Sequence, residues 1–124
     1  MAKRSLAELE QRYVDMIGFT PPKVAKRLKL GMDVDPDLLV ALEDWRLAAL
    51  TPDALDPKTV QLISFAILLV QTSEAAGNHA KAAIRAGATR EELHAAAALA
   101  ALFRGLAAFN LAGEIIGGLF PDAK

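Results

Sequence analysis

The sequence predicts an all-α protein, a compact bundle of about six or seven short helices. Helix-start signals recur along the chain, in which a capping residue or an Asp-Pro pair precedes an apolar stretch. Stretches that alternate apolar and polar residues, as half-buried strands do, are almost absent. With 124 residues, of which 53% are hydrophobic, the chain has the size of one domain with one core. We therefore expect a single helical domain over residues 1–124.

The first two helices are marked by a capping pair and by prolines. Ser5 and Glu8 have the spacing of a capping box, in which each side chain bonds the other residue's backbone N–H. The Pro pair at 21–22 ends the first helix and starts a short second one, because proline is tolerated in the first helical turn. We expect the second helix to run through Leu30 and to stop at Gly31.

The third and fourth helices each begin at an Asp-Pro pair. Asp35-Pro36 and Asp56-Pro57 combine an N-cap residue with proline at the first helical position. The segment Thr51–Leu55 is the predicted loop between these helices, and Lys58–Thr72 is the predicted fourth helix. In the third helix the predicted apolar stripe is Leu38, Leu39, Leu42, Trp45 and Leu50.

In the segment 78–93, NHAKAAIRAGATREEL, one helix is predicted to end and the next to begin within a few residues. Gly87 is expected to stop the helix that carries His79. Thr89 and Glu92 then form a second capping box.

The last two helices are predicted over Arg90–Arg104 and from Leu106 to about Leu119. Gly113 and Gly117 recur one helical turn apart, which predicts close packing against a neighbouring backbone. Aromatic residues have helical spacings that suit the core, namely Trp45, Phe65, Phe103, Phe109 and Phe120.

Composition excludes several classes of function. The 14 basic and 15 acidic residues are interspersed and give a net charge of -1, so no nucleic-acid partner is expected. The apolar run 63–70, which Ser64 interrupts, is far shorter than the about 20 residues that a membrane-spanning helix needs. The first residues turn acidic and helical, unlike a signal peptide, so a cytoplasmic location is expected. The large apolar fraction for so small a domain suggests burial between subunits.

The absence of cysteine has chemical consequences. The chain contains 0 cysteines, which removes disulfides, thiolate catalysis and thiolate metal sites together. Its 2 histidines, His79 and His94, are well separated and have no acidic cluster beside them. We therefore expect neither a metal nor another cofactor.

A line of polar residues lies on one side of the otherwise apolar fourth helix. Gln61, Ser64 and Gln71 share this side, and Thr72 lies beside the last of them. Such a line is a subunit contact, a hydrated seam, a pocket wall or a partly solvated face. Gln61 and Thr72 are candidate substrate-binding residues on the pocket interpretation.

The chain contains three segments that occur together in a known group of proteins: DPKTVQLISFAILLV, NHAKAAIRAGATREEL and RGLAAFN. They resemble the carboxymuconolactone decarboxylase superfamily, which includes the alkylhydroperoxidase D-like proteins. The resemblance extends from about Pro36 to Gly118. It implies a small all-helical fold and a homo-oligomer, commonly a trimer or a hexamer.

One branch of that superfamily performs thiol redox chemistry, and this chain departs from it. The branch uses two cysteines before the histidine and a glutamate on the preceding helix. Counting back from His79 puts the cysteine positions at Thr72 and Ala75, or at Ser73 and Ala76 if one residue is skipped. The glutamate falls near Val60 or Gln61. Hydroxyl and methyl groups do not replace a nucleophilic thiolate and its resolving partner, so thiol peroxidase and disulfide reductase activity are excluded.

The decarboxylase branch needs neither cysteines nor a cofactor, and it implies a set of candidate catalytic residues. His79 would be the general acid/base and Glu74, which matches an acidic position of the branch, would orient it. Arg104 or Arg85 would bind a substrate carboxylate. Each residue also has a purely structural interpretation. The His79 ring could be bonded to backbone or to Glu74. Glu74 could be a carboxylate favoured near a helix start, and Arg104 a cation favoured in a last helical turn. His94 is expected to be exposed, without a role.

Two functions remain open at this stage. The first is a cofactor-independent, lyase-like enzyme acting on a small carboxylated lactone or related acid. The second is a non-catalytic oligomer, a scaffold or small-molecule binder that has lost the redox cysteines.

Overall fold

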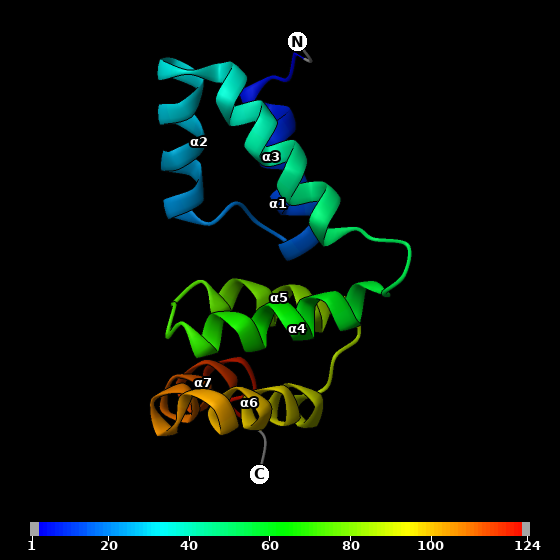
Figure 1. Cartoon of the computed structure of the whole chain (residues 1–124), viewed down its shortest axis with the longest axis vertical. Helices are drawn as coiled ribbons and strands as arrows, with labels where there is room; N and C mark the ends of the chain where they lie inside the picture. Colours follow the sequence, from blue (N-terminus) through cyan, green and yellow to red (C-terminus); the bar gives the residue numbers. More distant parts are fainter. Residues whose placement is uncertain (1–2, 123–124) are drawn as a thin grey trace. The chain divides into compact units, whose positions relative to one another are not determined.

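The structure, a computed structural model, describes residues 3–122 and contains seven α-helices and no strand in that part (Figure 1). The all-α prediction is confirmed. None of these helices is long and apolar enough to cross a membrane. The helices are α1 (Leu6–Ile17), α2 (Pro22–Val34), α3 (Pro36–Leu50), α4 (Pro57–Val70), α5 (Ala76–Arg85), α6 (Arg90–Arg104) and α7 (Leu106–Leu119).

The helices fall into two compact units. Unit 1 is Met1–Ala54 and contains α1, α2 and α3, whereas unit 2 is Leu55–Lys124 and contains α4 to α7. The boundary lies in the loop predicted between the two Asp-Pro pairs. The expectation of a single domain over residues 1–124 stays a prediction.

The Asp-Pro pairs start their helices as the sequence predicts. Asp35 Oδ1 accepts the N–H of Leu38 at 3.1 Å, and Asp56 Oδ1 accepts the N–H of Thr59 at 2.7 Å. In both helices proline occupies the first turn, where its missing N–H costs no helical hydrogen bond. The Thr59 N–H also lowers the pKa of Asp56 below its ordinary value.

The two predicted capping boxes differ in completeness. At the start of α6 the Thr89 hydroxyl accepts the Glu92 N–H and the Glu92 carboxylate accepts the Thr89 N–H, each at 3.0 Å. At the start of α1 the structure gives one half, the Glu8 N–H donated to Ser5 Oγ at 3.1 Å. Both helix starts lie where the sequence predicts them.

Glu92 also forms an ion pair that joins two helix starts within unit 2. Its Oε2 lies 2.8 Å from Lys58 Nζ, in the first turn of α4. The hydrogen bond from Lys58 lowers the pKa of Glu92, and the same bond raises the pKa of Lys58. The pair therefore keeps its charges across the neutral range.

Gly31 does not stop α2, so that prediction is wrong. The helix continues to Val34 and ends at Asp35, the residue before a proline, where helical backbone is disfavoured. A Cβ added at Gly31 would lie 3.0 Å from Leu39 Cδ1. The glycine is therefore a contact point between α2 and α3, and one glycine inside a helix costs only about 1 kcal/mol.

The buried face of α3 is not the stripe that the sequence predicts. Leu39, Val40 and Glu43 are buried, whereas Leu38 and Leu42 are exposed and Trp45 is 72% exposed. Apolar residues occur on all sides of this helix, so spacing alone does not select the inward side. The selection depends on the contacts of Glu43.

Glu43 belongs to a polar network that joins the three helices of unit 1. The Tyr13 hydroxyl donates to Glu43 Oε1 at 2.6 Å and accepts a hydrogen bond from Arg27 Nη2 at 2.6 Å. Arg27 Nη2 also lies 3.4 Å from Glu43 Oε2, and Arg46 Cζ lies 4.4 Å from the centre of the Tyr13 ring. Burial, reinforced by the hydrogen bond to Glu43, raises the pKa of Tyr13.

Unit 2 has two layers, one of α4 with α5 and the other of α6 with α7 (Figure 1). Its core combines a few large side chains with many alanines, so the helices approach closely. Phe65 is fully buried, as predicted, and Phe109 and Phe120 pack against this core. Phe103 is 81% exposed, so its assignment to the core is wrong, as is that of Trp45. Phe103 lies in the last turn of α6, three residues after the buried Ala100.

Glycines end two helices of unit 2 with a positive φ. Gly87 ends the α5 turn at φ 100°, and Gly105 alone joins α6 to α7 at φ 101° and ψ -171°, a conformation nearly restricted to glycine. A Cβ added at Gly113 or Gly117 would meet nothing within 4 Å among the described residues. The prediction that these two glycines pack closely is therefore wrong within the chain.

The network of unit 1 gives the first prediction. Replacing Tyr13 by phenylalanine removes a hydroxyl that both donates to and accepts from charged groups, so unit 1 should lose about 1.5–3 kcal/mol of stability at neutral pH. Because the folded pKa of Tyr13 is raised above 10.0, its contribution is present below that pH and lost as the pH rises through the folded pKa.

The measurement uses the single Trp and the single Tyr of the chain. Trp45 fluorescence in urea follows the unfolding of unit 1, and tyrosinate absorbance follows Tyr13 alone. We expect the native chain to lose stability above about pH 10, and Tyr13→Phe to show a smaller loss there. Equal stabilities of the two chains at pH 7 would contradict the network's role.

Candidate active site in unit 2

The candidate site is centred on a hydrogen bond between α5 and α4. His79 Nδ1 lies 2.8 Å from Gln61 Oε1. Gln61 is 3% exposed and is one of two buried polar or charged residues among those described, with Glu43. A buried amide needs partners, so this bond holds the His79 ring against α4 in a defined orientation.

The partner atom determines which nitrogen of the neutral His79 ring carries the lone pair. An amide oxygen only accepts, so Nδ1 of His79 is the donor. In the neutral ring the lone pair is then on Nε2. The Nδ1–H···O bond is also compatible with the doubly protonated ring, so Gln61 can hold His79 in both protonation states.

The packing of α5 brings the two residues within reach. Ala76, Ala80 and Ala83 of α5 are fully buried. Because alanine is short, α5 lies close to its neighbours, and the medium-length Gln61 side chain spans the gap to His79. Alanine also favours the helix intrinsically, although this segment has only 10 residues.

The turn before α5 contains a backbone conformation that is unusual for its residue type. Thr72 has φ 50°, and its N–H and that of Ser73 are donated to Leu69 O and Leu68 O, each at 2.9 Å. These two bonds are those of a helix end whose left-handed residue is usually glycine. A β-branched residue there is strained, and such strain is frequent near functional sites.

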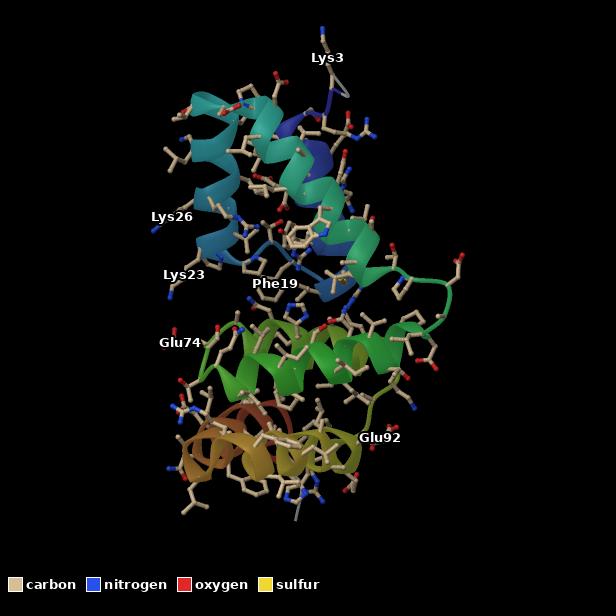
Figure 2. The ribbon with its side chains drawn as sticks, in the orientation of Figure 1. Lys3, Phe19, Lys23, Lys26, Glu74 and Glu92 are labelled. Atoms are coloured by element: carbon tan, nitrogen blue, oxygen red, sulfur yellow. The ribbon has the colours of Figure 1, made fainter. Side chains whose placement is uncertain are left out.

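The other predicted site residues lie in different places. Glu74 is exposed in the turn between α4 and α5, and Figure 2 shows it at one end of unit 2, with Glu92 at the opposite end. The orientation of the His79 ring, expected from Glu74, comes at Nδ1 from Gln61. Arg104 is exposed in the last turn of α6, and its side chain forms no hydrogen bond or ion pair with any residue of 3–122. The structure thus brings His79 and Gln61 together and leaves Arg104 apart from them.

The remaining polar residues of α4 have local partners. The Ser64 hydroxyl donates to Val60 O at 2.8 Å within its own helix. Gln71 is exposed and ends α4.

His94, exposed as expected, has its ring centre 5.7 Å from that of Phe109. In the described chain no group of three or more His, Asp or Glu residues could hold a metal ion.

Sequence comparison identifies the group to which these residues belong. The model of the carboxymuconolactone decarboxylase family matches residues 36–115, from the start of α3 to the later part of α7. The chain belongs to the carboxymuconolactone decarboxylase family. No curated protein and no solved structure matched the chain.

Family membership confirms the resemblance predicted from the three segments, and the structure refines it at one position. The resemblance places the acid of the preceding helix near Val60 or Gln61, and Gln61 is the one that contacts His79. An amide therefore contacts the histidine where the redox branch of the superfamily has a carboxylate. The amide oxygen accepts a hydrogen bond from Nδ1–H but carries no negative charge. It therefore orients the His79 ring without stabilising the protonated ring as a carboxylate would.

The turn at Thr72 gives the second prediction. Thr72→Gly should relieve about 1–2 kcal/mol of left-handed strain in the folded chain. Glycine also raises the conformational entropy of the unfolded chain, which offsets part of this gain, so the net increase in stability should be about 0.5–1 kcal/mol. The matched control is Gly87→Ala, at a left-handed position with free space around it, which should lose about 1 kcal/mol. Urea unfolding followed by far-UV circular dichroism measures both. A loss of stability in Thr72→Gly would contradict the assignment of strain.

The bond between Gln61 and His79 gives the third prediction. Gln61→Leu leaves the Nδ1–H without its amide acceptor and should cost about 1–3 kcal/mol in stability. Gln61→Glu places a negative charge beside the ring, so His79 should titrate at a higher pH than in the native chain. Proton NMR of the two histidine rings measures this, and His94 is the internal control. A titration of His79 that does not change in Gln61→Glu would contradict the contact.

Proposed function

We propose that this protein catalyses cofactor-independent acid/base chemistry, with His79 as the proton-transferring residue, on a small carboxylated lactone or a related acid. The observation that carries the proposal is the 2.8 Å bond between His79 Nδ1 and the buried Gln61. A catalytic histidine needs a fixed ring orientation and tautomer, and this contact supplies both. Family membership supports the substrate class, and the absence of cysteine restricts the chemistry to reactions without a thiolate.

The step assigned to His79 is the protonation of carbon after loss of carbon dioxide. The bond between the substrate carbon and its carboxylate breaks, carbon dioxide leaves, and the electron pair moves into the adjacent carbonyl as an enolate. Nε2 of the protonated ring then delivers its proton to that carbon, and the ring regains a proton from water. Nδ1 stays bonded to Gln61 throughout, so the ring does not need to turn.

Glu74, Thr72 and Arg104 remain the further candidates of this proposal. Glu74 and Thr72 belong to the turn that leads into α5, close in sequence to His79. A cation aimed at the departing carboxylate or at the enolate oxygen would contribute much of the acceleration. Arg104 is the candidate for that role, and its exposure means that substrate or a second copy of the chain would have to bring it to the site.

The alternative is a non-catalytic member that binds small molecules or serves as an oligomeric scaffold. The amide at Gln61 favours it, because an amide next to His79 transfers no proton. On either function we propose a homo-oligomer, a trimer or a hexamer, located in the cytoplasm. The exposed apolar side chains of unit 2, among them Ile67, Leu102 and Phe103, support an assembly.

The fourth prediction distinguishes the two functions. His79→Ala should lower turnover of the correct substrate by about 10²–10⁴-fold, the usual contribution of a general acid/base. His94→Ala is the matched control, since its ring is exposed on α6, and it should keep full turnover.

The measurement is a screen of small carboxylated lactones and related acids against both variants and the native chain, with thermal shift and turnover read together. Equal ligand stabilisation with lost turnover in His79→Ala supports catalysis. Ligand stabilisation without turnover in any chain contradicts catalysis and favours a small-molecule binder. No response from any chain favours a scaffold.

A further inference from the structure

The outer side of α6 presents an apolar surface that no described residue of unit 2 covers. Ala95, Ala98, Leu99 and Leu102 are exposed and recur at the spacing by which one helix packs against another. Leu99 is 62% and Leu102 74% exposed. We name these four residues the α6 seam. The opposite side of the helix is already used by the core of unit 2.

The α6 seam is chemically uniform. Residues 95–103, AAAALAALF, contain no charged side chain and no polar side chain. Docking this surface against another helix would therefore leave no buried charge and no side-chain donor or acceptor without a partner. Phe103 flanks the seam and adds to the exposed apolar area.

The order of side-chain sizes along the seam selects the occupant. The seam begins with two small residues, Ala95 and Ala98, and ends with two large ones, Leu99 and Leu102. Two copies of α6 in antiparallel orientation set Leu102 of one copy against Ala95 of the other. Large side chains then fill the spaces over small ones, as close packing requires. In a parallel pair leucine would meet leucine and alanine would meet alanine, which leaves gaps at one end.

We propose that α6 pairs antiparallel with α6 of a second copy of this chain, about a two-fold axis beside Ala98 and Leu99. Such a contact is isologous, because the same surface is used by both copies. In a closed assembly such a contact requires an even number of copies. It does not depend on the chemistry assigned to His79.

The expected strength follows from the size of the contact. One helix pair covers less surface than the about 800 Å² per partner of a standard interface. We therefore expect the α6 contact alone to be weak and to depend on protein concentration, unless other surfaces of the assembly reinforce it.

The absence of cysteine makes a cross-linking test specific. The chain has 0 cysteines, so one introduced thiol reports only its own position. Near a two-fold axis a residue faces its own copy, and Leu99→Cys or Ala98→Cys should form a covalent dimer on mild oxidation. Ala95→Cys and Leu102→Cys should each remain uncross-linked alone and should form a mixed dimer when combined. Asn110→Cys, at an exposed position on α7, is the control and should not cross-link.

A second measurement follows the native contact without a disulfide. Leu102→Glu introduces a charge into the seam and should weaken association at least about tenfold in analytical ultracentrifugation. Because Leu102 is exposed in the chain, circular dichroism should be unchanged. Ala107→Glu, at an exposed position on α7, is the matched control and should associate like the native chain.

Several results would overturn the pairing. Cross-linking of Ala95→Cys alone and of Leu102→Cys alone would show a parallel pair. A native chain that stays monomeric at all concentrations, with no cross-link at Ala98 or Leu99, would exclude the contact. A trimer whose mass is unaffected by Leu102→Glu would contradict the pairing and leave the oligomer and the His79 chemistry standing.

Discussion

The close packing of α5 on α4 is the constraint on which the candidate site depends. Alanines fill the inward side of α5, and their short side chains let the helix lie near its neighbours. Only at such an approach does the Gln61 amide reach the His79 ring at 2.8 Å. A larger residue at Ala76, Ala80 or Ala83 would push α5 outward, because a packed core tolerates little added volume. The alanine content of this half of the chain is therefore tied to the position of one polar contact.

The nature of that contact separates this chain from the thiol chemistry associated with its superfamily. Both cysteines are missing from the sequence, and the structure adds that an amide occupies the position that contacts the histidine. An amide fixes the tautomer of a ring and relays no proton. The proposed function accordingly assigns a direct proton transfer between His79 Nε2 and the substrate, without a relay through position 61.

The two units use buried polar groups in different ways. In unit 1 Glu43 is held by Tyr13 and Arg27 from two other helices, and this network decides which side of α3 turns inward. In unit 2 Gln61 is held by the histidine to which chemistry is assigned. The side of a helix that faces solvent is then the side opposite these buried contacts. Trp45 is exposed because Leu39, Val40 and Glu43 occupy the inward side of α3.

Much of the fold was determined by the sequence alone, because helix starts and stops depend on local chemistry. Asp35, Asp56 and Thr89 accept backbone N–H groups a few residues away, so the starts of α3, α4 and α6 lie where predicted. The sequence also identified the family and the candidate His79. Which side of a helix faces inward was decided only by the tertiary structure, since α3 and α6 carry apolar residues on more than one side. The pairing of Gln61 with His79 likewise joins residues distant in sequence, and its formation depends on how closely α4 and α5 pack. Spacing along one helix contains no information about that distance.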